Sequence, residues 1–166
     1  MGANDAWLIR SAKTGDGADL ASLVPDPDRR AWRLRNADEA RETLLVAELD
    51  SHVIGAVSIR WNGGCDAPNP WIYGGEVLPN QRRKGIGTSL WQEAHRLCRN
   101  RGARATSLDV DVTNAGARRL YERLGYVVVG PHEHRWVGRD SETAAVIAQG
   151  TADTWLMRCA LPAEDD

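Results

Sequence analysis

The sequence predicts a mixed α/β fold in which helices cover a single sheet. Strand-like apolar runs and amphipathic stretches follow one another in the order strand, two helices, three strands, helix, strand, helix and two strands. Neither a repeat nor a linker-like segment divides the 166 residues, and a chain of this length buries a real core. We therefore expect one domain over residues 1–166.

The expected strands are apolar runs bounded by glycine, proline or asparagine. They lie at residues 7–10, 43–49, 53–61, 71–78, 106–112, 126–129 and 151–161. The second and third form a hairpin, and Pro79 stops the fourth. The polar segment 131–150 is expected to be a long connection, whose structure the sequence leaves open.

The expected helices lie at residues 14–24, 29–41, 85–101 and 115–124. Thr14, Asp28 and Asn114 stand where N-caps would be, before the first, second and fourth helices. The third helix carries an apolar stripe at a spacing of three or four residues. The stripe consists of Ile86, Leu90, Ala94, Leu97 and Cys98.

The most informative segment is the loop at residues 81–88, which reads QRRKGIGT. It joins the apolar strand to the amphipathic helix, and its three cations lead into Gly85 and Gly87. Glycines let the backbone turn tightly and present its N–H groups at a helix N-terminus, where an anion is favoured. The loop therefore predicts a site for the phosphates of a cofactor.

Two nucleotide-binding motifs do not fit this loop. The dinucleotide fingerprint needs a third glycine at position 90, which is Leu90, and an acidic residue about 20 positions on, where the chain is still helical and basic. The chain also has no GxxxxGK[ST] phosphate loop. A plain structural turn remains the alternative for the loop taken by itself.

Residues 77–87, VLPNQRRKGIG, resemble the acyl-CoA signature of the GNAT N-acetyltransferase superfamily. A second block follows at the spacing typical of that family, with LDV at 108–110, Asn114, Ala117, LYE at 120–122 and LGY at 124–126. The resemblance implies the GNAT fold, a mixed and mostly antiparallel sheet of six or seven strands flanked by about four helices. It also implies acetyl-CoA as the acyl donor.

The resemblance implies that acetyl-CoA binds along the strand that ends at Leu78 and on the loop at residues 81–88. The backbone of Val77 and Leu78 would pair with the pantetheine arm beside a splay in the sheet, and a backbone N–H near Val77 would support the oxyanion. Asn114 would cap its helix, bond the pantetheine, or do both. The pyrophosphate would lie on the loop N–H groups, with countercharge from the basic side chains; the residues involved are Arg82, Arg83, Lys84, Gly85, Ile86, Gly87 and Thr88.

The expected catalytic residues are Tyr121 and Glu76. Tyr121 matches the family tyrosine that protonates the departing thiolate, and an ordinary tyrosine pKa of about 10 suits that role. Glu76 interrupts an apolar strand, so burial is expected to raise its pKa toward that of a general base. The alternatives are a tyrosine that only packs on the cofactor and a glutamate that pairs with an arginine or binds a cationic substrate.

Other polar residues are weaker candidates. Asp109 and Asp111 lie on one strand face as a second acidic pair, while His132 and His134 are expected in a solvated loop. Their i, i+2 spacing does not suit a helical zinc pair, and we expect no metal. Direct attack in a ternary complex gives no catalytic role to the cysteines, which are Cys65, Cys98 and Cys159.

The composition of the chain limits its possible partners and its place in the cell. The net charge of −2 gives no basic excess for nucleic-acid binding. An odd number of cysteines without a CxxC pair favours a reduced, cytoplasmic setting. There is no apolar run of about 18 residues to span a membrane, and no signal-peptide pattern. Dimerisation is common among GNAT proteins, and the seven tryptophans suggest an apolar patch for a homodimer.

The sequence therefore predicts an N-acetyltransferase that moves the acetyl group of acetyl-CoA to a primary amine of a small molecule. Glu76, Asp109 and Asp111 suggest a cationic amine such as a polyamine or an aminoglycoside. The alternatives are a protein N-terminal or lysine acetyltransferase, a non-catalytic acyl-CoA-binding or sensor domain, and a nucleotide-binding module.

Overall fold

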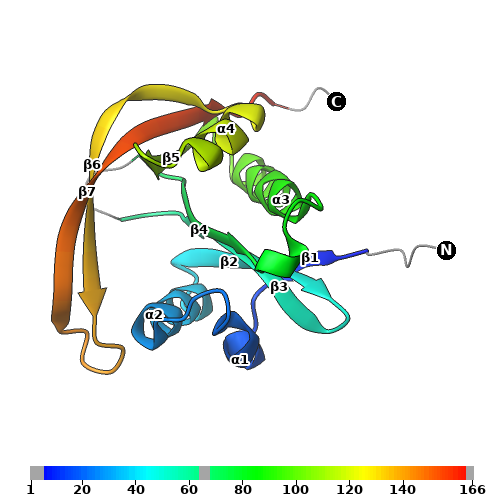
Figure 1. Cartoon of the computed structure of the whole chain (residues 1–166), viewed down its shortest axis with the longest axis vertical. Helices are drawn as coiled ribbons and strands as arrows, with labels where there is room; N and C mark the ends of the chain where they lie inside the picture. The colour runs from blue at the N-terminus through cyan, green and yellow to red at the C-terminus, as the bar shows by residue number, and fades with distance from the viewer. Residues whose placement is uncertain (1–5, 64–67, 164–166) are drawn as a thin grey trace.

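A computed structural model describes residues 6–63 and 68–163, and its centre is one seven-stranded sheet of order β1-β2-β3-β4-β5-β7-β6 (Figure 1). The strands are β1 Leu8–Ser11, β2 Glu42–Leu49, β3 His52–Arg60, β4 Trp71–Val77, β5 Ala105–Asp111, β6 Val127–Arg139 and β7 Val146–Ala160. The helices are α1 Gly17–Leu20, α2 Pro27–Asp38, α3 Ile86–Asn100 and α4 Ala115–Arg123, with 3-10 turns η1 Thr14–Asp16 and η2 Pro79–Gln81. The predicted fold class and element order are confirmed.

The N-terminal helices differ in detail from the prediction. The first is only a 3-10 turn and one turn of α-helix, and Thr14 lies within the turn. The N-cap of α2 is Asp26 and not Asp28, because Pro27 takes the first helical position. The Asp26 carboxylate accepts hydrogen bonds from the N–H groups of Asp28 and Arg29, at 2.9 and 3.1 Å.

The helices cover both faces of the sheet, with α1 and α2 on one side and α3 on the other (Figure 1). Alternate residues of β2 separate the two cores, since Leu44 and Val46 pack with α1 whereas Leu45 and Ala47 pack with α3. The predicted stripe of α3 faces the sheet, and Ile86, Leu90, Ala94 and Cys98 are all buried. The stripe thereby fixes α3, and its N-terminal loop, against the sheet.

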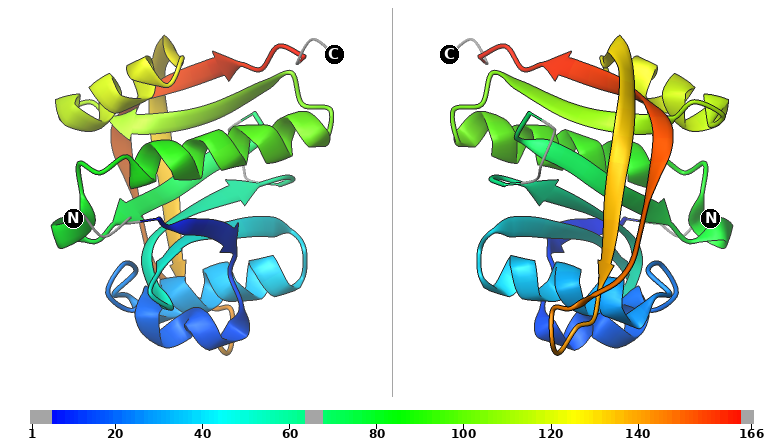
Figure 2. Two further views of the ribbon diagram at one scale, coloured as in Figure 1. Left: turned by 90° about the vertical axis from the view of Figure 1, so that its right-hand side faces the viewer. Right: turned by 90° about the vertical axis from the view of Figure 1, so that its left-hand side faces the viewer.

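Residues 131–150, expected to be a polar connection whose structure the sequence left open, lie mostly in β6 and β7. These strands form a two-stranded ribbon, with β6 paired to β7 from Val127–Arg158 to Arg139–Val146. The ribbon crosses the α2 side of the sheet (Figure 2). Its turn contacts α2, since the Ser141 N–H donates to Asp28 at 3.1 Å and the Ser141 carbonyl accepts a hydrogen bond from Arg35.

Glycines at the centre of β4 distort the strand. Ala56 pairs with Glu76 and Ser58 with Tyr73, so Gly74 and Gly75 together oppose one residue of β3 and form a bulge. The φ angle of Gly74 is +65°, a conformation that favours glycine. At Gly75, an added Cβ would lie 2.3 Å from the indole ring of Trp91 on α3.

Gly75→Ala is therefore expected to lower the free energy of unfolding by about 1–3 kcal/mol, because the new methyl group overpacks against Trp91. Thermal or denaturant unfolding measures the change. Gly15→Ala is the matched control, since a Cβ there meets no atom within 4 Å. Equal stability of the two variants would contradict the close packing at Gly75.

Two of the cysteines and six of the seven tryptophans are at least partly buried. Cys98 and Cys159 are buried free thiols, and Cys65 lies outside the described residues. Trp136 alone among the seven tryptophans is exposed, so they do not form the predicted patch, and a homodimer stays a prediction. In the described ranges, no helix is long and apolar enough to cross a membrane.

Candidate functional site

The sheet opens between β4 and β5, which are its parallel pair. They pair at one position, Trp71 with Ser107, and separate beyond it. On β4, the Leu78 N–H donates to Ile54 of β3 at 2.9 Å, so strand alternation turns the N–H and carbonyl of Val77 toward the opening. The expected splay is present, and Val77 faces it.

The backbone of Leu78 is used within the protein. Its N–H bonds β3, and its carbonyl accepts from the N–H of Gln81 at 2.9 Å. The carbonyl of Val77 accepts from Arg82 Nε at 3.0 Å, although the Arg82 side chain is exposed and can move. Of the two strand residues, Val77 offers its backbone to a ligand in the splay, while Leu78 contributes its half-buried side chain.

The basic loop reaches the N-terminus of α3 through two left-handed residues, Arg83 at φ +63° and Gly85 at φ +91°. The first intrahelical bond runs from the Ser89 N–H to the Gly85 carbonyl, at 3.0 Å. The N–H groups of Ile86, Gly87 and Thr88 therefore have no acceptor within the helix. Arg82, Arg83 and Lys84 are exposed around them, which is the arrangement expected for binding a phosphate.

The space in front of this helix end is open, since a Cβ added at Gly87 would meet no atom within 4 Å. Gly87→Val is therefore expected to leave the fold intact but to block a phosphate from the N–H groups. Loss of one such charged hydrogen bond costs about 1.5–3 kcal/mol, or roughly tenfold to a hundredfold in the Kd for CoA. Calorimetry measures the Kd, with Gly15→Val as control; unchanged CoA affinity would contradict the assignment.

Tyr121 on α4 lies beside the splay. Its ring contacts Trp91 at 5.4 Å and Tyr126 at 6.1 Å between centroids. Burial, together with the charges of Asp109 on β5 and Glu76 on β4, raises its pKa to about 12. Because one carboxylate on each of the diverging strands acts on the Tyr121 hydroxyl, this hydroxyl lies near the opening between β4 and β5. With this raised pKa, Tyr121 keeps its proton at neutral pH.

Asn114 caps α4 as predicted, and its side-chain oxygen accepts from the Ala117 N–H at 3.1 Å. Its side chain is exposed, so contact with a ligand is compatible with capping. Glu76 is exposed, not buried as expected, because β4 has parted from β5 at that point. It lines a hollow of about 120 Å³ with residues of α2, including Arg29 and Arg33.

Asp109 and Asp111, the second acidic pair of the sequence analysis, have different hydrogen-bond partners. Asp111 is exposed and accepts from the N–H and hydroxyl of Thr113, at 2.8 and 2.6 Å, which lowers its pKa. Asp109 instead accepts from His134 Nδ1 at 2.8 Å and from the Thr154 hydroxyl at 3.1 Å. His134 and its neighbour His132 lie in β6, so their predicted place in a solvated loop is wrong.

Asp109 on β5 orients His134 on β6, and the His134 side chain lines a large cavity described below. The hydrogen bond to Asp109 raises the pKa of His134 above its ordinary value, while burial and the charges of Arg29 and Arg60 oppose that rise. With Nδ1 donating to the carboxylate, the neutral imidazole keeps its lone pair on Nε2. In the described ranges, no cluster of three or more histidine, cysteine or acidic side chains could hold a metal ion.

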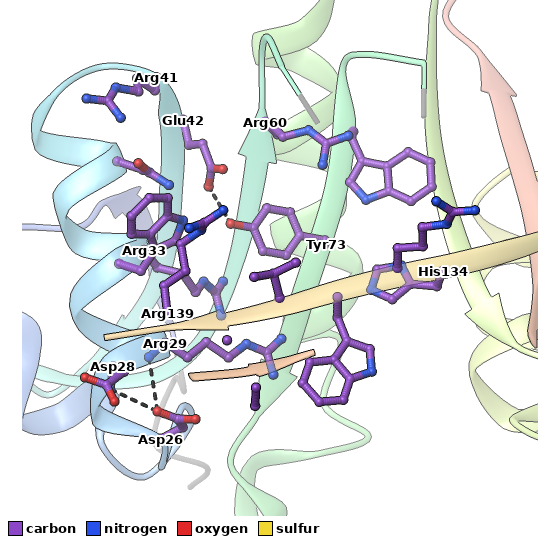
Figure 3. A pocket seen from close by; sticks show the side chains of 18 of the residues that line it. Asp26, Asp28, Arg29, Arg33, Arg41, Glu42, Arg60, Tyr73, His134 and Arg139 are labelled. Atoms are coloured by element: carbon purple, nitrogen blue, oxygen red, sulfur yellow. Dashed lines mark hydrogen bonds between the residues drawn. The ribbon is translucent and has the colours of Figure 1, made fainter. Parts of the chain in front are cut away.

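A cavity of about 900 Å³ lies between α2, the β2–β4 side of the sheet and the β6–β7 ribbon (Figure 3). Its lining includes Trp32 and Arg33 from α2, Arg60 and Tyr73 from the sheet, and His134 from the ribbon. The sequence did not indicate this cavity, because its lining residues come from six separate segments of the chain. The only local signal was the cluster of arginines near the start of α2.

Comparison with known proteins agrees with this geometry. The family model described as Acetyltransferase (GNAT) family matches residues 10–126. The chain is 30% identical to the uncharacterized N-acetyltransferase YhfO of Bacillus subtilis, covering 71% of this chain and 88% of that protein. It is 26% identical to mycothiol acetyltransferase of Thermobispora bispora, covering 74% of this chain.

The chain spans about half the length of the first curated relatives, 51% of one and 42% of another. Among solved structures, PaiA N-acetyltransferase from Thermoplasma acidophilum in complex with coenzyme A superposes with a TM-score of 0.67. The identity is 15%, over 93% of this chain and 99% of that one. The matched family model covers well over half of the sequence, and the chain belongs to the acetyltransferase (GNAT) family.

Proposed function

We propose that the protein transfers the acetyl group of acetyl-CoA to the primary amine of a small molecule, by direct attack in a ternary complex. The observation that carries this proposal is the splay between β4 and β5, which has the Val77 N–H on one side, Tyr121 nearby and the basic loop at its end. Acetyl-CoA supplies an activated thioester, and the exposed loop and open helix end suit its phosphates.

In this reaction the amine nitrogen forms a bond to the acetyl carbon as the carbon–sulfur bond breaks. One proton leaves the amine and one joins the thiolate. The Val77 N–H donates to the developing oxyanion, and the Tyr121 hydroxyl donates the proton to sulfur. A tyrosine pKa of about 12 keeps that proton in place until the thiolate forms.

Two groups are proposed for removing the amine proton. Glu76 lies on β4 beside the hollow that α2 helps to form. His134 lines the larger cavity and is oriented by Asp109, with its free Nε2 available for a proton. The hydrogen bond to Asp109 makes His134 the better supported base, because it fixes the tautomer and raises the pKa of the ring.

The cavity has a volume of about 900 Å³ and walls on several sides, which favours a small acetyl acceptor over a protein. The turn of the β6–β7 ribbon is hydrogen-bonded to α2 at Asp28 and Arg35, so the ribbon forms one wall of this cavity. The expected cationic acceptor is not supported. Asp109 accepts a hydrogen bond from His134, and Asp111 accepts one from Thr113 in the turn that follows β5. The carboxylates of Glu76, Asp109 and Asp111 therefore do not form one site.

The test is release of thiol from acetyl-CoA with a panel of amines, for the wild type, Tyr121→Phe and Glu76→Gln. The proposal expects amine-dependent release by the wild type and a large loss with Tyr121→Phe. Tight CoA binding without turnover on any amine would instead support a non-catalytic acyl-CoA-binding domain. Binding of ATP or NAD in preference to CoA would support a nucleotide-binding module.

A further inference from the structure

The large cavity carries an excess of positive charge. Its lining includes more guanidinium groups than carboxylates (Figure 3). The arginines are Arg29, Arg33, Arg41, Arg60, Arg135 and Arg139, and the acids are Asp26, Asp28 and Glu42. Such a lining attracts an anion and disfavours a polycationic amine.

The three acids are already engaged by other parts of the protein. Asp26 caps α2, and Asp28 accepts from the Ser141 N–H of the ribbon. Glu42 accepts from the Tyr73 hydroxyl at 2.5 Å, and burial raises its pKa although that hydrogen bond and the charges of Arg33 and Arg60 oppose the rise. In the ranges that the structure describes, none of these carboxylates forms an ion pair with an arginine of the cavity.

Arg33 and Arg60 are the most buried of the cationic side chains. Arg33 is 2% exposed, and it donates to two neutral oxygens, Ser58 Oγ at 2.9 Å and the Gly74 carbonyl at 3.2 Å. Arg60 donates from Nε to Asn69, while its Nη2 is buried and has no hydrogen-bond partner within the described residues. Neither guanidinium forms an ion pair within the described residues, and the charges of Glu42 and Glu76 offset only part of the cost of burying Arg33, whose pKa burial still lowers. An anionic ligand would offset more of that cost.

Arg29 is the third cation of interest, and it lines both the large cavity and the smaller hollow that contains Glu76. It is exposed, and its side chain forms no hydrogen bond or ion pair that the described part of the chain provides. Arg29 and Arg60 are both close enough to His134 to oppose the rise of its pKa. Arg29 and Arg33 also line the hollow that contains Glu76. The cations therefore lie beside both proposed bases.

The remaining walls are aromatic, with Trp32, Trp71, Tyr73 and Trp136 around the cavity. Indole and phenol rings bury the apolar body of a ligand, and guanidinium groups bind carboxylate or phosphonate oxygens, in many cases in pairs. A ligand that satisfies both features has an apolar body and an anionic group. Its amine then reaches the proposed bases, which adjoin the cations.

We propose that the acetyl acceptor is a small primary amine that also carries an anionic group, as in an amino acid or an aminophosphonate, and that Arg29, Arg33 and Arg60 bind this group. The inference rests on the proposed acetyltransferase function. It replaces the cationic acceptor that the sequence suggested, because the fold gathers arginines, not carboxylates, around the acceptor cavity.

The test compares acetyl acceptors that share an apolar body and a primary amine and differ in the group on the α-carbon. They are L-phenylalanine, its aminophosphonate analogue, phenylalaninamide and phenethylamine, with the corresponding leucine set. The expected result is a kcat/KM at least about tenfold higher for the two anionic members, because each gains charge-assisted hydrogen bonds. The phosphonate and carboxylate members show which anion fits better. Acetylation that favours the neutral or cationic members would overturn the inference and leave the proposed function standing.

Arg29→Gln is the informative variant, because this exposed side chain forms no hydrogen bond or ion pair with the described residues, and its removal should leave the fold intact. It is expected to raise KM about 10- to 100-fold for the anionic acceptors and to leave phenethylamine unchanged, with partial recovery in Arg29→Lys. Arg104→Gln, an exposed arginine outside the cavity, is the matched control. An equal effect of Arg29→Gln on all acceptors would contradict anion binding.

If no amine is acetylated, the proposed function fails, and the anion site is tested separately. Calorimetry with N-acetyl-L-phenylalanine and its amide then compares an anionic and a neutral ligand of the same shape. Tighter binding of the acid, weakened by Arg29→Gln, would support the site. Equal binding of the two, or none, would overturn it.

Discussion

Tyr121→Phe is expected to lower kcat by about 10²-fold or more, because it removes the proposed proton donor to the thiolate. The variant should fold normally. No hydrogen bond of the Tyr121 hydroxyl is found among the described residues, and the ring contacts with Trp91 and Tyr126 remain. CoA affinity should therefore change little, and the loss should appear in kcat and not in the Kd for CoA.

Tyr126→Phe is the control for Tyr121→Phe. The Tyr126 hydroxyl is buried and lies 2.8 Å from both His95 Nε2 and Thr106 Oγ1. Its removal leaves buried polar groups without a partner, so it should lower the melting temperature without a comparable loss of kcat. If Tyr121→Phe retained kcat within about twofold of the wild type, the tyrosine would only pack on the cofactor, and the proposed acid would be rejected.

His134→Gln is expected to lower kcat/KM by about 10²-fold, the usual range for loss of a general base. A base acts when deprotonated, so activity falls as the pH drops through its pKa. Asp109 raises the pKa of His134, whereas burial and the Arg29 and Arg60 charges lower it. Asp109→Asn should therefore move the acidic limb of the pH–rate profile to lower pH and reduce the rate.

His132→Gln provides the control on the same strand face. His132 packs against Trp71, with ring centroids 6.0 Å apart, and is not part of the cavity lining. Its replacement should leave the pH profile in place. If Glu76→Gln abolished turnover while His134→Gln and Asp109→Asn left the acidic limb unchanged, Glu76 would be the base, as the sequence first suggested.

Local patterns were sufficient to predict the donor side of the site. The loop cations, Gly85 and Gly87, and the stripe of α3 act within about twenty residues of one another, so their spacing carries the geometry. The cap at Asn114 is likewise a local interaction. These features depend on hydrogen bonds and packing between near neighbours in the chain.

Long-range features were missed. The two strands of the β6–β7 ribbon pair mainly with each other, and polar side chains on both faces remove the alternation that marks a half-buried strand. Pro131 is tolerated because β6 is an edge strand. The ribbon brings His134 to Asp109 and closes the cavity, so the second base and the acceptor site were both hidden with it.

The exposure of Glu76 has a similar origin. The sequence of β4 is that of a strand in the middle of a sheet, which predicts burial. The separation of β4 from β5 after Trp71 exposes it, and that separation is a property of the pairing and not of the strand. The same separation creates the site, so the failed expectation and the functional feature have one cause.

The central claim is that the splay between β4 and β5 supports acetyl transfer to an amine. Mass spectrometry of primary amines incubated with the protein and acetyl-CoA tests it most directly, with thiol release measured in the same samples. The account predicts an N-acetylated amine with one thiol released for each acetyl group transferred, and loss of both with Tyr121→Phe. Tight binding of acetyl-CoA with no acetylated product from any amine would contradict it.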